Sequence, residues 1–201
     1  MTAAISTQRA DARRNRERLI DAAGRAFASG GENVTLEAIA KATGVGIGTL
    51  YRHFPTREAL VEAVYHDQVA GLHQGAQDLL ARYDAARALR LWMDLFADWV
   101  ATKHGMIDAL RAMISSGDIA FAQTRSEIVA SIRVLLEAGA AAGELRGDVE
   151  AEDVIANLAG VMAVAGTPGQ REQAGRLFDL LMDGLRRGPA GRVAHDDGRA
   201  R

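Results

Sequence analysis

The chain has 201 residues, of which 48% are hydrophobic and 25% charged, the balance of an ordinary globular protein. Its length suits one large domain or two small ones and is enough to bury a core. The absence of cysteine excludes disulfides, zinc fingers and thiol catalysis and favours a reducing compartment. Because the N-terminus is polar and no apolar run reaches membrane-spanning length, we expect a cytoplasmic protein with no membrane partner.

The net charge of −2 conceals an uneven distribution along the chain. Residues 1–57 hold nine basic and five acidic side chains, a net charge of +4, which leaves −6 for residues 58–201. A basic segment on an acidic chain indicates an anionic partner such as DNA for that segment. A solvated basic helix face is the alternative interpretation of the same charge count.

Helical patterns dominate the sequence, because Ala and Leu are frequent and β-branched alternation is scarce. In the first pattern, Leu19, Ala23 and Phe27 repeat every four residues and form one apolar stripe. The predicted fold class is therefore all-α. About nine helices are expected, at 8–28, 36–42, 46–54, 57–83, 84–105, 106–114, 124–142, 153–165 and 170–187, followed by a disordered tail at 188–201.

Residues 34–54 read VTLEAIAKATGVGIGTLYRHF and contain the signals of a helix-turn-helix motif. Thr35 is a good N-cap for the first helix, and Gly44 suits the left-handed position that reverses the chain. In such a motif the second helix enters the DNA major groove. Gly46 and Gly48 then remove side-chain bulk where the backbone has to approach DNA.

The second helix of this motif has two chemically different faces. Thr49 and Tyr51 offer hydroxyl groups to phosphate oxygens, and Arg52 suits either a phosphate or a guanine. Leu50 and Phe54, four residues apart, point the other way and are expected in the core. A short structural helix in an all-helical core would leave the polar residues unexplained.

The segments RERLIDAAGRAFASGG and VTLEAIAKATGVGIGTLYRHFPTREALVEAVY, within about residues 14–65, resemble the DNA-binding domain of the TetR family of bacterial transcriptional regulators. The resemblance implies an N-terminal helix-turn-helix domain at 1–57 and an effector-binding and dimerisation domain at 58–187. One departure is Gly46, where the family commonly has a serine or a similar cap. The DNA contacts that the resemblance implies come from Thr35, Gly46, Ile47, Thr49, Tyr51, Arg52, His53 and Arg57. For His53, closing the edge of the motif is an equal alternative.

Tryptophan, methionine and phenylalanine are concentrated after residue 91. Helical spacing makes core packing the first interpretation, and an apolar pocket with adaptable methionine walls is the second. The resemblance favours the pocket, with His104 and Arg111 as candidate polar contacts. The candidate ligand-binding residues are Trp92, Met93, Phe96, Trp99, Met106, Leu110, Met113, Phe121 and Met162.

No sequence motif indicates catalysis. A nucleophile elbow, a phosphate-binding loop and an HExxH motif are all absent. His66 and His73 are seven residues apart, wider than helical metal ligands usually are, and no third ligand accompanies them. We therefore expect neither an enzyme nor a metal or cofactor.

The sequence predicts a homodimeric repressor that a small, largely apolar ligand releases from a pseudo-palindromic double-stranded DNA operator. The alternative is a helix-turn-helix factor without a small-molecule effector. The last two helices are the expected dimer surface. The side chains expected there are Leu158, Val161, Met162, Leu177, Leu180, Leu181 and Leu185.

Overall fold

The computed structural model describes residues 2–30, 34–104, 106–116 and 121–186. Within these ranges the chain forms nine α-helices, one 3-10 turn and no β-strand, which confirms the predicted all-α class. The predicted tail at 188–201 lies outside the described residues. The helices are α1 (Thr2–Gly30), α2 (Leu36–Thr43), α3 (Ile47–His53), α4 (Arg57–Leu80), α5 (Ala85–His104), α6 (Ile107–Ser116), α7 (Phe121–Ala141), α8 (Ala151–Ala165) and α9 (Arg171–Leu185), with the 3-10 turn η2 at Pro168–Gln170.

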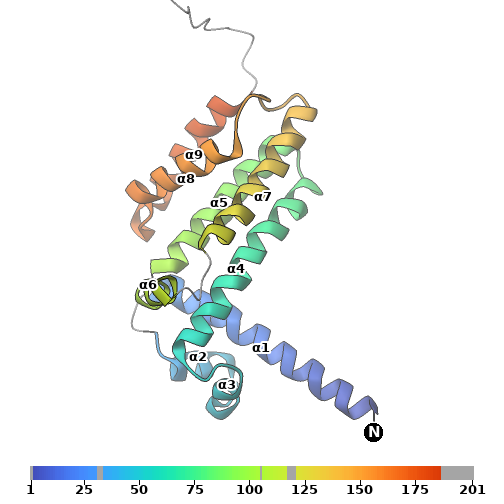
Figure 1. The fold of residues 1–201 in the computed structure, drawn as a ribbon, viewed down its shortest axis with the longest axis vertical. Coiled ribbons are helices and arrows are strands. Elements are labelled where there is room, and N and C mark those ends of the chain that lie inside the picture. The colour runs from blue at the N-terminus through green and yellow to red at the C-terminus, as the bar shows by residue number, and fades with distance from the viewer. Residues whose placement is uncertain (1, 31–33, 105, 117–120, 187–201) are drawn as a thin grey trace, which may run out of the picture.

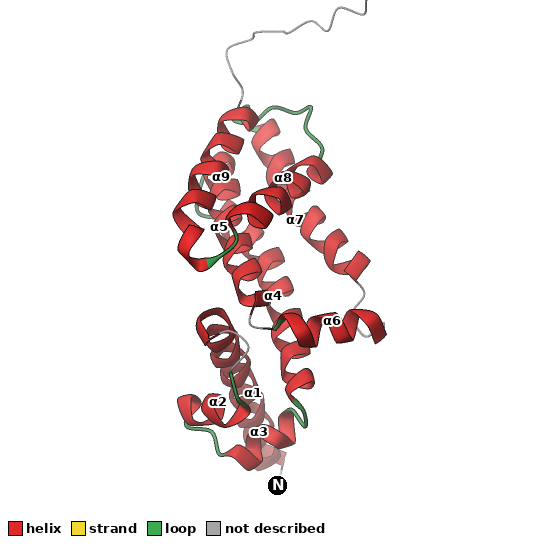
Figure 2. Cartoon of the chain, turned by 90° about the vertical axis from the view of Figure 1, so that its left-hand side faces the viewer, coloured by secondary structure: helices red, strands yellow, loops and turns green. Residues whose placement is uncertain are grey.

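The molecule has a small end and a larger helical bundle that share one long helix. Figure 1 shows α1, α2 and α3 gathered at one end, with α5, α7, α8 and α9 at the other. Helix α4 packs on α1 at the small end and on α5 and α7 inside the bundle. Helix α6 lies crosswise near the junction and contacts α4 and α5 (Figure 2). Movement of α4 would therefore reach both parts.

The small end is held together by the apolar stripe predicted on α1. Leu19 and Phe27 are buried there against Ile39 of α2 and Leu50 of α3. Gly44 ends α2 at φ 67° and ψ 14°, the left-handed conformation that glycine adopts without a steric penalty. The amide of the next residue donates to a carbonyl five residues back, which completes a Schellman turn. This turn sets the direction in which α3 leaves.

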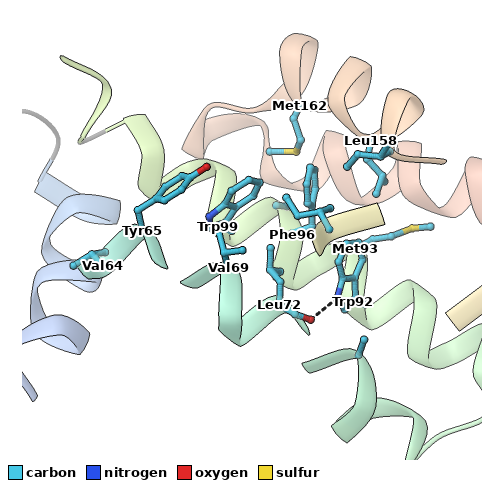
Figure 3. Close-up of a cluster of buried hydrophobic side chains, with 14 of the residues drawn as sticks. Val64, Tyr65, Val69, Leu72, Trp92, Met93, Phe96, Trp99, Leu158 and Met162 are labelled. Carbon is cyan, nitrogen blue, oxygen red and sulfur yellow. Dashed lines mark hydrogen bonds between the residues drawn. The ribbon is translucent and has the colours of Figure 1, made fainter. Parts of the chain in front are cut away.

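The bundle core is built around Trp92 of α5, which is fully buried. Its indole Nε1 donates a 2.8 Å hydrogen bond to the carbonyl of Leu72 on α4 (Figure 3). Nearby, a Cβ on Gly75 would lie 2.8 Å from Cδ1 of Leu95, so α5 approaches α4 closely because Gly75 lacks a side chain. Leu95 itself is 40% exposed where it lies over this glycine.

Ion pairs fasten α9 to the outer side of α5. Arg90 Nε lies 2.6 Å from an oxygen of Asp179, and its Nη1 lies 2.8 Å from Asp94. Arg171 reaches back from α9 to the same Asp94 at 2.8 Å and to Asp98 at 3.3 Å. A shared network of this kind restricts both helices more than isolated surface pairs do.

Candidate DNA interface and ligand cavity

Helix α3 presents one face to the core and the opposite face to solvent. Leu50 is fully buried, whereas Ile47 is 41% exposed and Tyr51 is 44% exposed. Arg52 is also exposed, and Thr49 is half-buried beside it. The predicted faces are therefore correct, and the outward face carries a hydroxyl, a phenol and a guanidinium.

The two glycines of this segment are not required by the fold. A Cβ added to Gly46 or Gly48 would meet nothing within 4 Å, and neither residue has a positive φ. Gly46 caps α3 without a side-chain hydrogen bond, as the sequence predicts. The protein itself leaves open space at both positions, which is the arrangement that close approach of another molecule needs.

Three other predicted contact residues flank α3. Thr35 caps α2 and accepts a 3.2 Å hydrogen bond from the amide of Ala38, so its hydroxyl proton remains available to a phosphate. Arg57 is half-buried at the start of α4, and its guanidinium lies 5.4 Å from the ring centroid of Phe27. His53 is half-buried with its ring centroid 6.2 Å from that of Phe54, which is compatible with both of its predicted roles.

The arginines of α1 largely bind within the protein. Arg18 donates a 2.8 Å hydrogen bond to the carbonyl of Thr43 at the end of α2. The guanidinium of Arg16 lies 5.3 Å from the ring centroid of Phe54. These contacts attach α1 to the helix-turn-helix motif and place positive charge around it.

A cavity of about 430 Å³ lies between α5, α7 and α8 and is partly open to solvent. Its volume is within the usual range for small-molecule sites. Apolar side chains form most of its wall. The lining residues are Phe96, Trp99, Val100 and Lys103 from α5, Thr124, Arg125 and Ile128 from α7, and Ile155, Ala159, Met162 and Ala163 from α8.

Only part of the predicted ligand set reaches this cavity. Phe96, Trp99 and Met162 form its wall, with the rings of Phe96 and Trp99 5.5 Å apart (Figure 3). Trp92 and Met93 are fully buried in the core on another side of α5, and they do not line it.

The remaining candidates divide into two groups. Met106, Leu110 and Met113 are buried, in and just before α6, away from the cavity wall. For these residues the structure shows core packing, the first interpretation of the pattern. Arg111 is exposed and lies 3.7 Å from Asp108 of its own helix. The side chains of Phe121 and His104 lie outside the described part of the structure.

Lys103 is one of the cavity residues that sequence reasoning missed. Its Nζ lies 3.4 Å from the ring centroid of Trp99 and 5.8 Å from that of Tyr65 on α4. Burial lowers the pKa of this ammonium to about 8, because a low-dielectric environment disfavours its charge. A signal was present: the chain has 22 arginines but only two lysines, and this one follows Trp99 by four residues, one helical turn along the apolar face.

Among the described residues, no three His, Asp or Glu side chains come together in a way that would hold a metal ion. Over the same residues, none of the helices is sufficiently long and apolar to span a bilayer.

These features define a helix-turn-helix protein with a second helical domain. They are the exposed helix α3, the left-handed glycine turn before it, and a separate helical bundle that contains a cavity. Two family models match these parts separately. Residues 19–64 match the model described as bacterial regulatory proteins, tetR family. Residues 84–187 match the model of the SbtR-like transcriptional regulator C-terminal domain.

Solved structures agree with these matches. The chain is 46% identical to a TetR transcriptional regulator from Streptomyces coelicolor, with a TM-score of 0.80 over 87% of this chain and 99% of that one. It is 34% identical to a TetR regulatory protein from Mycobacterium vanbaalenii, with a TM-score of 0.72 over 90% and 99% of the two chains. The chain therefore belongs to the TetR family of bacterial transcriptional regulators, and it is a regulator, not an enzyme.

Curated relatives are similar over a short region. A helix-turn-helix-type transcriptional regulator of Staphylococcus aureus strain USA300 is 45% identical over 53 residues, which are 26% of this chain. The match spans only 29% of that relative's length. It supports a helix-turn-helix regulator and says nothing about the effector.

Proposed function

We propose that the protein is a homodimeric repressor whose DNA affinity is lowered by a small ligand bound between α5, α7 and α8. One observation carries this proposal: α4 runs from the end of the helix-turn-helix motif to a contact with the wall of the cavity. The helix begins at Arg57, beside Phe27 of the small end. Two turns later the ring centroid of Tyr65 lies 6.3 Å from that of Trp99, a wall residue of the cavity.

This connection supplies a route for the switch. A ligand that displaces Trp99 also displaces Tyr65, because both rings are buried in contact and packed interiors transmit strain. Tyr65 moves α4, and the start of α4 moves the helix-turn-helix motif. The ligand then shifts the population toward the arrangement to which it binds better, at the expense of the DNA-binding one.

We propose α8 and α9 as the dimer surface, with a membership that differs from the sequence-based expectation. Leu158, Met162 and Leu185 are buried inside the protomer, so they belong to its own core. Leu180 and Val164 are each 66% exposed. Such exposed apolar side chains on neighbouring helices favour a second protomer over solvent.

Two glycines on the same helix faces support this surface. Gly160 is four residues before Val164, and Gly184 is four residues after Leu180. A Cβ at either glycine would meet nothing within 4 Å in one protomer, so both positions allow close helix approach. Val161, Leu177 and Leu181 are half-buried beside them. A four-helix contact of two α8–α9 pairs would relate the two copies by a two-fold axis.

In this dimer, residues 1–57 bind DNA and residues 58–187 bind the effector and the partner. The two α3 helices would enter successive major grooves of a pseudo-palindromic operator, about 34 Å apart. Contacts from Tyr51 and Arg52 read base edges or phosphates, and Ile47, Gly46, Gly48 and Thr49 form the surface that approaches the groove. Thr35, His53 and Arg57 flank it.

Selection of bound genomic fragments, followed by ligand screening against the recovered operator, tests the proposal. Both tryptophans of the chain lie on α5, so intrinsic fluorescence reports on this helix. A true effector changes that fluorescence and releases DNA over the same concentration range. Linkage also requires that operator DNA weaken effector binding by the same factor.

A variant that fills the cavity separates this function from its alternative. Ala159→Phe adds a ring to the cavity wall, whereas Ala130→Phe adds the same ring to an exposed position on α7. We expect both variants to bind the operator and only Ala159→Phe to lose the ligand response. A factor that needs no small effector would show no ligand response in any of the three proteins.

A further inference from the structure

Lys103 places an ammonium group at the wall of an otherwise apolar cavity. Its side chain is mostly buried, and it makes no ion pair with a carboxylate in the described part of the chain. Glu127 is close enough to act electrostatically on Tyr65, but it is exposed and makes no ion pair with Lys103. The Nζ of Lys103 lies over the rings of Trp99 and Tyr65.

An unpaired ammonium in such a place opposes burial, since removing a charge from water is unfavourable without a counter-charge. The ring of Trp99 partly compensates, because its negative face attracts the cation at 3.4 Å. This contact also favours the charged form, so Lys103 is mainly protonated at neutral pH even though burial lowers its pKa to about 8. The cavity therefore presents a positive charge that forms no ion pair with any carboxylate of the described residues.

Other polar groups gather at the same end of the cavity. Thr124 is buried close to Tyr65, and Arg125 follows it on α7. Arg125 is exposed and has no acidic partner among the residues with described side chains. Lys103 lies in the last turn of α5, and Thr124 and Arg125 lie in the first turns of α7; all three line the same cavity. The wall farther along is apolar and includes Phe96, Ile155 and Met162.

We infer that the cavity binds an amphipathic organic anion, with a carboxylate-type head at Lys103, Thr124 and Arg125 and an apolar body against Phe96, Ile155 and Met162. The inference rests on the proposed function in one respect, that the occupant of this cavity is the effector. It sharpens that function. The apolar wall alone would accept neutral molecules, whereas the positive end favours molecules that carry an anionic head group.

The test compares three probes with the same ten-carbon chain: decanoate, 1-decanol and decyltrimethylammonium, each below the concentration at which it forms micelles. Binding is measured without DNA by calorimetry and by intrinsic fluorescence. We expect decanoate to bind the wild-type protein at least tenfold more tightly than 1-decanol, with decyltrimethylammonium the weakest. Equal binding of decanoate and 1-decanol, or no binding of any probe, would overturn the inference.

Substitutions identify the residue that causes the preference for an anionic head group. Lys103→Met keeps a long apolar side chain and should remove the preference for decanoate while leaving 1-decanol binding within about twofold. Lys103→Arg should retain most of the preference, because it keeps the charge. Lys41→Met, at an exposed position on α2, is the matched control and should bind the three probes as the wild type does. A preference that survives in Lys103→Met would contradict the assignment.

A second measurement observes the ammonium directly. Reductive methylation with 13C-formaldehyde labels the two lysines while preserving their charge, so the spectrum contains two lysine signals besides that of the N-terminus. Decanoate should shift the signal of Lys103 and raise its pKa, because an adjacent anion favours the protonated form. The signal of Lys41 should stay in place. A decanoate complex that leaves the Lys103 signal and its pKa unchanged would place the head group elsewhere.

DNA release separates this inference from the proposed function. If decanoate binds through Lys103 but leaves the operator complex intact, the anion site stands and the ligand switch fails. If a neutral molecule fills the cavity and releases DNA while decanoate shows no preference, the switch stands and the anion site fails.

Discussion

The phenol of Tyr51 on α3 donates a hydrogen bond to the carboxylate of Glu37 on α2, with an oxygen–oxygen distance of 3.3 Å. This is long for an O–H···O bond, which usually measures 2.5–3.0 Å, so the interaction is weak. Both side chains are exposed on the side that we assign to DNA. The pair therefore holds Tyr51 near α2 until a phosphate competes for its proton.

Glu37 should oppose DNA binding because its negative charge lies beside the predicted contact residues. We expect Glu37→Gln to tighten operator binding by about threefold, since the change removes repulsion at an exposed site where single charges contribute ~1 kcal/mol or less. Fluorescence anisotropy with operator DNA measures the change. Glu137→Gln, exposed on α7, is the control and should have no effect. Weaker binding by Glu37→Gln would mean that the carboxylate positions Tyr51 productively.

Gly48→Ala should separate stability from DNA binding. Within a helix, Gly is less favourable than Ala by about 0.5–1 kcal/mol, and an added Cβ at this position meets nothing in the protein. We therefore expect a higher unfolding temperature together with operator binding reduced at least tenfold. Denaturation and anisotropy on the same sample check both effects. Unchanged DNA affinity would show that α3 does not approach the groove at this residue.

Tyr51→Ala and Arg52→Ala should each weaken operator binding strongly and leave folding intact, because both side chains point away from the buried Leu50 face. A lost contact of Arg52 with a base should cost about 1–3 kcal/mol, and a lost phosphate contact should reduce the salt slope by about 1. Thermal melting and dimer mass are the structural controls. If either variant unfolds, the faces of α3 are assigned incorrectly.

Salt dependence tests the electrostatic part of the interface. Neutralising phosphates releases counterions, so the logarithm of the operator association constant should fall linearly with the logarithm of salt concentration. Arg82→Ala, at an exposed position just after α4, should leave the slope unchanged. A flat plot for the wild-type protein would contradict the assignment of the basic N-terminal part to DNA.

The helix-turn-helix motif could be predicted because its signals are local. Thr35, Gly44 and Thr56 determine caps and a turn through their own side chains and backbone preferences, so neighbouring residues suffice to place α2, α3 and α4. The exposed face of α3 followed from the spacing of Leu50 and Phe54 alone.

The cavity could be predicted only in part because three distant helices form it. A period of three to four residues shows that Trp92 and Trp99 are both buried, yet it cannot show which of them borders empty space. That depends on how α8 packs over α5 and α7. The same limit affected the dimer surface, where Leu158 and Leu180 both fit an apolar stripe but only Leu180 is exposed.

Leu180→Arg should convert the dimer into a folded monomer. The side chain is 66% exposed in the protomer, so an arginine is harmless there but would place two like charges close to a two-fold axis. Sedimentation should show half the mass, with helical content unchanged and operator affinity lost. Val134→Arg on α7, where valine is 41% exposed, is the matched control. A dimer that persists in Leu180→Arg would place the interface elsewhere.

Lys103→Met should stabilise the protein in the absence of ligand, and the gain should depend on pH in a defined direction. Burial lowers the pKa of Lys103 from 10.5 to about 8 in the folded protein. Below pH 8 the lysine is charged in both folded and unfolded chains, and its desolvation opposes folding fully. Between pH 8 and 10.5 the unfolded chain binds more protons than the folded one, so this opposition to folding declines as pH rises.

We expect Lys103→Met to raise the free energy of unfolding by about 1–3 kcal/mol at pH 7, a gain that the contact with Trp99 reduces and that shrinks toward pH 10.5. Urea denaturation of both proteins across this range measures it, with Lys41→Met giving a flat difference. A constant difference between Lys103→Met and the wild type would show that burial does not disfavour the ammonium, and would remove the physical basis for its need of an anion.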